Sequence, residues 1–365
     1  MSLLVRAAEG GRLPDPLLRW GIRRLCRRRL REQQALRRRD PAHRRHFVDA
    51  LAAGPVAVAQ DAANRQHYEM PPGFFERVLG PRLKYSCCHW PSGVQDLAAA
   101  EESMLELVAK RARLADGQRI LDLGCGWGSL TSWLAERFPE ARVVAVSNSA
   151  PQRRFIESRL AALGAGNVEV ITADVGGLEQ RPGTAGPFDR VVSIEMFEHV
   201  RNWQVLLGRI AAWLAPEGLA FLHVFCHREH AYLFEDGGDD DWMARHFFTG
   251  GLMPSDQLVR SFDRDLVVEE QWRVSGRHYQ RTAEAWLDNL DASRDELQPL
   301  LAAKYGEADA GLWLQRWRLF FLACAELFGY RRGEEWWVTH CLLRPRVAPR
   351  EPSTTVVAEP LHRSS

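Results

Sequence analysis

Apolar runs and amphipathic stretches alternate along the middle of the chain. Short runs rich in Val, Ile, Leu and Phe predict buried strands, and apolar residues at helical spacing between them predict helices. The predicted strands are Arg119–Leu123, Arg142–Val146, Val168–Thr172, Phe188–Ile194 and Gly218–Phe225. The predicted helices between them are Leu130–Arg137, Ala150–Leu163 and Trp203–Leu214. This order predicts an α/β fold with a doubly wound, mostly parallel sheet, whose ligands bind beyond the carboxyl ends of the strands.

Further helices are predicted on both sides of this alternation. One covers Leu97–Ala112, and three aromatic-rich helices follow the last predicted strand, over Ala283–Leu290, Glu296–Tyr305 and Trp313–Leu327. We therefore expect a basic helical segment and linker over residues 1–65, followed by a domain over residues 66–346. An α-helical substrate cap is expected within that domain from about residue 230. Residues 347–365, rich in Pro, Ser and Thr, are expected to form a disordered tail.

A glycine-rich turn follows the first predicted strand. Gly124, Gly126 and Gly128 stand at alternate positions, and Asp122 precedes them. Glycines allow a sharp turn and the close approach of a ligand, and the start of the next helix offers free N–H groups to an anion. A nicotinamide or flavin site would need G-x-G-x-x-G and an acid about 20 residues later, and this spacing differs. The turn resembles that of the Rossmann-like class I methyltransferases, which bind S-adenosyl-L-methionine. The alternative is a glycine turn that only shapes the backbone and binds no cofactor.

Three titratable residues stand together at the end of the fourth predicted strand. Glu195, Glu198 and His199 would face the cofactor crevice if the chain turns there. Methyl transfer requires a positioned nucleophile, and an amine must first lose a proton, which a carboxylate or imidazole can accept. These residues are therefore candidates for the catalytic site of an amine methyltransferase. The alternative is an ordinary helix N-terminus, where acids are favoured by the helix dipole.

Composition and charge limit the partners and the cell compartment that we expect for this chain. The chain has 365 residues, a formal net charge of +1 and seven scattered cysteines. A near-zero charge gives no global field that favours nucleic acid, so no nucleic-acid partner is expected. The cysteines indicate free thiols in a reducing compartment. No signal-peptide pattern and no run of about 18 apolar residues occurs, so we expect a cytoplasmic protein.

The segment Leu17–Arg45 is rich in arginine and carries a partial apolar stripe. This pattern predicts a basic amphipathic helix. Its arginines could contact anionic lipid at a membrane surface, or nucleic acid. Alternatively they form a solvated face on a helix that caps the catalytic domain. The sequence is also compatible with a homodimer.

Two stretches raise the question of a metal. Cys87, Cys88 and His89 are adjacent, but neighbouring cysteines do not readily ligate one ion, and no second ligand pair stands at zinc spacing. The acidic stretch from Glu235 to Trp242 lacks the spacing of a calcium loop and is read as a solvated lid or as a rim that attracts a cationic amine. No metal site is predicted.

From about Gln66 to His340 the chain resembles the cyclopropane-fatty-acid synthase superfamily of S-adenosylmethionine enzymes. It is most similar to the coclaurine N-methyltransferase-like branch, which methylates amines. The matching motifs are Tyr85-Ser86-Cys87-Cys88, the glycine turn, Ile194–His199, Phe225-Cys226-His227, Asp239–Trp242, Phe247–Gly251, Gly276–Tyr279, Gly329-Tyr330 and Gly333–Trp336. The resemblance implies a one-carbon transferase. The alternative within the superfamily is a cyclopropane-fatty-acyl-phospholipid synthase or lipid methyltransferase that acts on unsaturated acyl chains, and a third reading is a cofactor-binding protein without turnover.

The resemblance also implies roles for individual residues. The positions that hold a bicarbonate base in the lipid branch match Cys87, Glu198, His223 and Tyr279. That branch carries glycine where this chain has Glu195, whereas amine methyltransferases carry glutamate. Cys324 matches a further cysteine of the family site, although its apolar neighbours favour a packing role. The implied cofactor-binding residues are Tyr85, Ser86, Asp122, Gly124, Gly126, Asn148, Gln152, Asp174 and Ile194.

Overall fold

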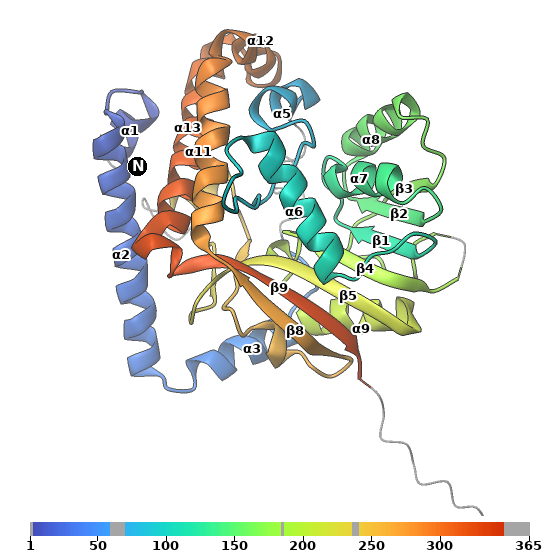
Figure 1. The fold of residues 1–365 in the computed structure, drawn as a ribbon. Coiled ribbons are helices and arrows are strands. Elements are labelled where there is room, and N and C mark those ends of the chain that lie inside the picture. The colour runs from blue at the N-terminus through green and yellow to red at the C-terminus, as the bar shows by residue number, and fades with distance from the viewer. Residues whose placement is uncertain (1–2, 59–69, 184–185, 236–240, 347–365) are drawn as a thin grey trace, which may run out of the picture.

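The computed structural model describes residues 3–58, 70–183, 186–235 and 241–346. Its centre is a seven-stranded sheet with the strand order β3-β2-β1-β4-β5-β9-β8 (Figure 1). The strands are β1 Arg119–Leu123, β2 Arg142–Ser147, β3 Val168–Thr172, β4 Phe188–Ile194, β5 Leu214–His227, β8 Leu266–Val274 and β9 Trp336–Pro345. A second, two-stranded sheet pairs β6 Tyr232–Leu233 with β7 Leu252–Met253. The predicted α/β fold with a mostly parallel sheet is confirmed.

The two strands β8 and β9 were not predicted from the sequence. The first five strands pair in parallel, whereas β9 pairs antiparallel with both β5 and β8. The sheet therefore extends beyond the doubly wound unit, and its last strand in the chain lies between two others. Strand β5 also begins earlier than expected, directly after α9 Trp203–Trp213.

Helices cover both faces of the sheet because its strands alternate between two apolar cores. Ile120 faces the core shared with the cap helices, whereas Leu121 faces the core shared with α9. The helices around the sheet are α6 Leu97–Arg111, α7 Ser129–Arg137, α8 Ala150–Ala162 and α9. A second group of helices, called the cap here, contains α5 Pro72–Val78, α10 Trp242–His246, α11 Gly276–Ala292, α12 Arg294–Tyr305 and α13 Glu307–Gly329. The substrate cap expected from about residue 230 stays a prediction. Single 3-10 turns are η2 Phe197–His199, η3 Val259–Ser261 and η4 Tyr330–Gly333.

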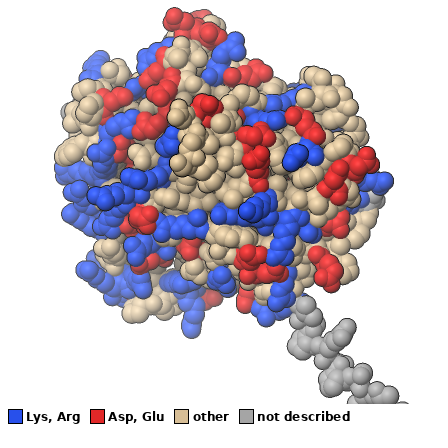
Figure 2. Space-filling view, viewed as in Figure 1, with Lys and Arg blue, Asp and Glu red and all other residues tan. Residues whose placement is uncertain are grey.

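The arginine-rich segment forms most of α2 Asp15–Arg39, which lies against the cap, and the start of α3 His43–Ala53. After α1 Leu3–Glu9, helix α2 runs alongside α13, and α3 leads toward α9 (Figure 1). Arg19 on α2 bonds Glu284 at 2.5 Å and Glu326 at 3.0 Å. This agrees with the interpretation of α2 as a helix that covers the cap. Basic side chains gather on the outer face of α2 (Figure 2), so contact with an anionic surface stays a prediction.

Two expectations concern residues that the structure describes only in part. The tail over residues 347–365 lies outside the described residues, as do residues 236–240 of the acidic stretch. In the acidic stretch, Asp241 follows the gap in the described residues and pairs with Arg29 at 3.1 Å. Helix α3 ends at Ala53, within the residues 1–65 that were expected to hold a helical segment and a linker. Within the described ranges, none of the helices has the length and apolar character needed to cross a bilayer.

Candidate active site

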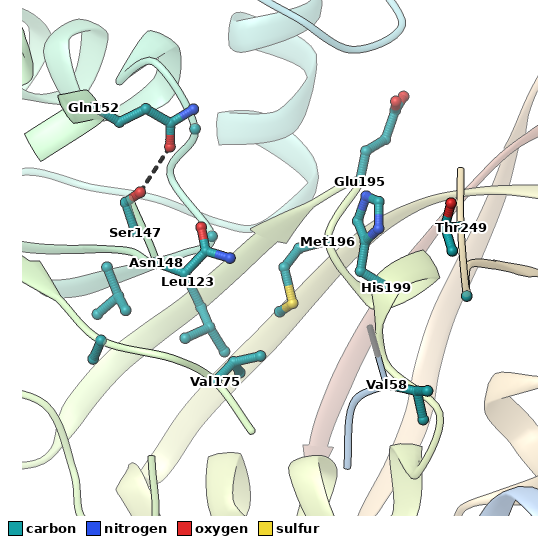
Figure 3. A pocket seen from close by; sticks show the side chains of 15 residues that line it. Val58, Leu123, Ser147, Asn148, Gln152, Val175, Glu195, Met196, His199 and Thr249 are labelled. Carbon is teal, nitrogen blue, oxygen red and sulfur yellow. Dashed lines mark hydrogen bonds between the residues drawn. The ribbon is translucent and has the colours of Figure 1, made fainter. Parts of the chain in front are cut away.

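A cavity opens at the carboxyl ends of β1, β2 and β4, the edge where the sequence predicts ligands to bind. Its lining residues are Val58, Leu123, Gly124, Gly126, Val146, Ser147, Asn148, Gln152, Ala173, Val175, Glu195, Met196, His199, Thr249 and Gly250. In Figure 3, Asn148 and Gln152 lie on one wall, and Glu195 and His199 lie on the opposite wall. A second hollow adjoins the first and shares Gly124, Gly126 and Glu195 with it. A ligand that extends through both hollows would therefore pass Glu195.

The three glycines of the turn share a backbone conformation, and two of them also leave space that a side chain would fill. Gly124, Gly126 and Gly128 have φ values of 85°, 53° and 78°, a left-handed region that disfavours other residues. A Cβ atom at Gly124 would lie 2.5 Å from the Cγ of Met196, so this glycine lets the turn pack against the end of β4. A Cβ at Gly126 would meet no atom within 4 Å and would instead occupy open cavity space. Gly126 thus leaves room for a ligand.

Buried polar atoms around the two hollows match a large polar ligand. Within the described part of the chain, the Nε2 of Gln152, the Nε1 of Trp127 and the Oγ of Ser129 are buried without a hydrogen-bond partner. The side chain of Gln152 is held because its Oε1 accepts a 2.7 Å bond from the Ser147 hydroxyl. Unpaired buried donors are costly, so these groups indicate acceptor atoms on a bound ligand. The residues present therefore fit the predicted cofactor.

Most of the predicted cofactor residues converge on these hollows. Asn148 and Gln152 line the cavity, and Tyr85, Ser86, Asp122 and Ile194 line the second hollow. Asp174 is the exception: it is exposed, accepts a 2.8 Å bond from the N–H of Gly176, and is not among the lining residues, although both of its neighbours in the chain are.

Asp122 is buried beneath the glycine turn. Its Oδ2 accepts a 2.7 Å hydrogen bond from the hydroxyl of Thr131. Burial raises the pKa of Asp122 to about 6, and the bonds from Thr131 oppose this shift only in part. A cationic group of a ligand, such as an ammonium, would stabilise the ionised form of this carboxyl group.

Glu195 is the centre of the site. Directly after β4, it adopts a left-handed φ of 47°, which is uncommon for a residue with a side chain. Its Oε1 accepts bonds from the N–H of Cys87 at 2.9 Å and from the Nε2 of His223 at 3.1 Å. Its Oε2 accepts a 2.6 Å bond from the hydroxyl of Tyr279. Backbone strain of this kind persists where the surroundings fix the residue, and three donors do so here.

Lys84 adds a positive charge that the sequence analysis did not select. This residue is 1% exposed, its ammonium group donates to the hydroxyl of Ser86, and it lines the second hollow. Among the described residues, no carboxylate lies within ion-pair distance of its ammonium group. Lys84 is one of only three lysines among the 48 lysine and arginine residues of the chain, and this is the signal that could have identified it. Its position suits the anionic group of a ligand.

Opposing influences act on the Glu195 carboxylate. Burial raises its pKa, whereas the charge of Lys84, the N–H of Cys87 and the hydroxyl of Tyr279 lower it. The pKa remains above its ordinary value. Because its pKa is raised, this carboxylate accepts a proton from an amine more readily than an exposed carboxylate does.

The two other titratable residues of the predicted cluster have different surroundings. His199 lines the cavity opposite Asn148 (Figure 3), and its ring lies 4.8 Å from that of Phe248. Glu198 is fully buried and does not line the cavity. Its Oε1 accepts a 2.7 Å bond from the N–H of Phe225, and burial followed by the charge of Glu195 raises its pKa well above the ordinary value. Glu198 therefore supports the turn after β4 through its bond to β5 and does not face the cavity.

The cysteines near Glu195 are buried thiols. Cys87 contributes its N–H to Glu195, while its thiol donates to the carbonyl of Cys88 at 3.3 Å. Cys324 is 9% exposed on α13, and burial followed by the charge of Glu195 raises its thiol pKa. Burial likewise raises the thiol pKa of Cys87. Neither group is poised as a thiolate nucleophile. His89, the third member of the Cys-Cys-His run, bonds the hydroxyl of Ser103 at 3.0 Å.

Comparison with known proteins assigns the family. The family described as mycolic acid cyclopropane synthetase matches residues 58–335. The chain belongs to this family. Within the family, the chain is 35% identical over 348 residues to (S)-coclaurine N-methyltransferase of Thalictrum flavum subsp. glaucum, covering 94% of this chain and 95% of that one. It is 30% identical over 303 residues to cyclopropane-fatty-acyl-phospholipid synthase of Escherichia coli strain K12, covering 80% and 73% respectively.

Solved structures agree with this assignment. A crystal structure of coclaurine N-methyltransferase bound to N-methylheliamine and SAH is 36% identical, with a TM-score of 0.88 over 93% of this chain and 98% of that one. A cyclopropane synthase from Mycobacterium tuberculosis is 22% identical with a TM-score of 0.65, over 80% of this chain and 99% of that one, and shares the fold. The predicted class I methyltransferase fold and the predicted superfamily are confirmed, and the protein is an enzyme of the methyltransferase type.

Proposed function

We propose that the protein transfers a methyl group from S-adenosylmethionine to the nitrogen of a small amine. The observation that carries this proposal is the placement of Glu195. Its carboxylate is fixed by three donors from separate parts of the chain and borders both hollows of the site. The relatives that resemble the chain over 94% of its length are named as N-methyltransferases.

The site supplies the groups that this reaction needs. When bound, S-adenosylmethionine supplies a methyl carbon attached to a sulfonium. Glu195 attracts the protonated amine, and Glu195 and His199 are placed to accept its proton so that the nitrogen lone pair becomes free. Held by Asp122, Gln152 and Lys84, the cofactor would supply its methyl group to the freed lone pair, with the carbon–sulfur electron pair leaving on sulfur. The carboxylate of Glu195 offsets the positive charge that arises on nitrogen.

The cofactor residues act mainly by positioning. Gly126 leaves space in the cavity, and Gln152, Trp127 and Ser129 offer buried donors. Asp122 offers a carboxyl group to a cation, and Lys84 offers a cation to a carboxylate, which matches the two charged groups of an amino acid such as methionine. Holding both reactants in one geometry lowers the entropic part of the barrier.

The alternative acceptor is an unsaturated acyl chain. In that branch, the resemblance assigns a bicarbonate ion to the positions that match Cys87, Glu198, His223 and Tyr279. Here the N–H of Cys87, the ring of His223 and the hydroxyl of Tyr279 bind the Glu195 carboxylate instead. Since an ionised carboxylate beside an apolar chain costs several kcal/mol unless it is paired, this arrangement favours an ammonium over a lipid tail.

A transfer assay tests the acceptor. Methyl-labelled cofactor is supplied with secondary and tertiary amines, including benzylisoquinolines, and in parallel with vesicles of unsaturated phospholipid. We expect label in amines, and a loss of turnover of about 10- to 1,000-fold in Glu195→Gln. Glu179→Gln, which changes an exposed glutamate away from the site, is the matched control. Label in acyl chains, or amine turnover that survives Glu195→Gln, Glu198→Gln and His199→Ala alike, would overturn the proposal.

Calorimetry tests the cofactor site separately. Asp122→Ala removes the carboxyl group beneath the turn, and Gly126→Val places a side chain in the open cavity. Both variants should lose measurable binding of S-adenosylmethionine. Unchanged affinity in both would show that the cofactor binds elsewhere.

A further inference from the structure

A line of hydrogen bonds leads from the half-buried Arg111 to the Glu195 carboxylate. The Nη1 of Arg111 lies 2.8 Å from the Nδ1 of His340. The Nε2 of His340 lies 2.9 Å from the Nδ1 of His223. The Nε2 of His223 lies 3.1 Å from Glu195 Oε1. Each step is within hydrogen-bond distance, so the four residues form one continuous series.

The sheet places these residues side by side. Strand β9 lies between β5 and β8 (Figure 1). His223 on β5 and His340 on β9 are direct partners in the antiparallel β5–β9 pairing, and Trp272 on β8 is the next partner of His340. Arg111 comes from the last turn of α6, where its guanidinium lies 5.1 Å from the centre of the Trp272 ring. A cation is favoured both at a helix C-terminus and over an aromatic face.

The chemistry of arginine gives the series a direction. A guanidinium carries only donors, so the Nδ1 of His340 must accept. A neutral His340 then carries its proton on Nε2 and donates it to the Nδ1 of His223. His223 in turn carries its proton on Nε2 and donates to Glu195. The facing nitrogens of the two rings cannot both carry protons at 2.9 Å, so the opposite order would leave Arg111 facing another donor.

Burial favours the neutral form of both imidazoles. His223 and His340 are fully buried, and burial lowers the pKa of each well below the ordinary value. The cations Lys84 and Arg111 lower both values further, and His89 adds to this effect at His340. The groups that face the Glu195 end of the series are Lys84, Tyr279, Glu198 and the thiols of Cys87 and Cys324.

We propose that Arg111 and His340 are positioning residues that fix the tautomer of His223, so that His223 always presents an N–H to Glu195. This inference rests on the proposed role of Glu195 as the group that receives the amine. The donated N–H holds Oε1 in one orientation and stabilises the ionised carboxylate. Arg111 thereby acts on the site through two rings and touches neither reactant.

The tautomer can be observed directly in the full-length protein. Histidine labelled with ¹⁵N reports by NMR which ring nitrogen carries the proton, with His223→Gln and His340→Gln used to assign the two spectra. We expect the wild type to show neutral His223 and His340, each protonated on Nε2, throughout pH 6–9. A His223 ring that is protonated on Nδ1, or doubly protonated, in the wild type would overturn the proposal without any variant of Arg111.

Variants of Arg111 then test the consequence. Arg111→Gln can donate or accept, so it no longer sets the direction, whereas Arg111→Lys keeps a group that only donates. We expect Arg111→Gln to populate both His223 tautomers and to lower kcat by about 10- to 100-fold, by analogy with metal-ligating histidines that lose the partner that orients them. The KM for the cofactor should not change, and Arg111→Lys should retain the tautomer and most of the rate. The control is Lys110→Gln, which removes an exposed cation from the same helix turn.

The outcomes separate this inference from the proposed function. Retention of a single Nε2–H tautomer and of the full rate in Arg111→Gln would overturn the positioning role. A wild type that shows the expected tautomers but methylates no amine would contradict the proposed function and leave the tautomer assignment in place.

Discussion

Tyr279 and Glu195 are 84 residues apart in the chain and are joined by a 2.6 Å hydrogen bond from the phenol to Oε2. The ring of Tyr279 stacks on Phe328 with 4.1 Å between ring centres, so the hydroxyl has little freedom to turn away. The carboxylate is therefore held on both oxygens, by Tyr279 on one and by Cys87 and His223 on the other.

Removal of this phenol should shift the pH dependence of the enzyme. Burial raises the pKa of Glu195 and the Tyr279 hydroxyl opposes it, so Tyr279→Phe raises the pKa further. Because the base must be ionised, activity falls as pH drops through that pKa, and the acidic limb of kcat/KM should move to higher pH. A hydrogen bond to a charged group contributes about 1.5–3 kcal/mol, which corresponds to ~1–2 pH units. Tyr305→Phe, away from Glu195, is the control; an acidic limb that stays in place in Tyr279→Phe would contradict the assignment.

Replacement of Glu195 by glycine should create a site for a small anion. Glycine adopts the φ of 47° without strain, while the donors from Cys87, His223 and Tyr279 remain. We expect Glu195→Gly to lose amine turnover and to regain part of it when formate or bicarbonate is added. Glu195→Gln, whose amide fills the same space, should not respond. Equal insensitivity of both variants to either anion would show that these donors do not form an anion site.

Lys84 should recognise the carboxylate of the bound cofactor. We expect Lys84→Met to weaken S-adenosylhomocysteine binding by about 10- to 100-fold, the effect of a hydrogen bond to a charged group. Binding of 5′-methylthioadenosine, which lacks the amino-acid part, should change little. Lys110→Met, at an exposed lysine, is the control. A similar loss for both ligands in Lys84→Met would indicate a general disturbance of the hollow rather than carboxylate recognition.

Asp122 should limit the stability of the cofactor-free enzyme at neutral pH. Its pKa is 3.8 in a model compound and about 6 in the fold, so the folded state binds the proton more tightly between these values. The stabilisation by protonation is complete below pH 3.8 and is lost as pH rises through 6. Asp122→Asn should therefore exceed the wild type in unfolding free energy at pH 8 by on the order of 3 kcal/mol. The difference should shrink at pH 5. Denaturant unfolding without cofactor measures it, with Asp116→Asn as an exposed control, and a difference that is equal at both pH values would refute the burial argument.

The sequence predicted the parts of the fold that local pattern determines. Strands β3 and β4 match the prediction residue for residue because each is a short segment rich in Val, Ile or Phe and bounded by turns. Strand β8 escaped prediction because Glu269, Glu270, Gln271 and Arg273 give it the polarity of a surface segment. It is a strand because β9 provides a pairing edge, and that is a property of the assembled sheet.

The same distinction applies to the site. Glu195 and His199 could be found because they stand close together at the end of one strand, and the glycine turn marks the cofactor cavity. The series from Arg111 could not be found, because His340 lies 229 residues from Arg111 and 117 residues from His223 in the chain. No local pattern relates them until β9 pairs with β5.

The position of β9 also sets an order of assembly during translation. It is the last of the described strands to leave the ribosome, yet its place is between β5 and β8. The five parallel strands can collapse earlier, but the free edge of β5 has no partner until residues 336–345 emerge. His340 arrives on this strand, so a nascent chain holding the complete glycine turn and Glu195 still lacks the ring that aligns His223. With the proposed role of His340, the site is complete only after the final strand closes the sheet.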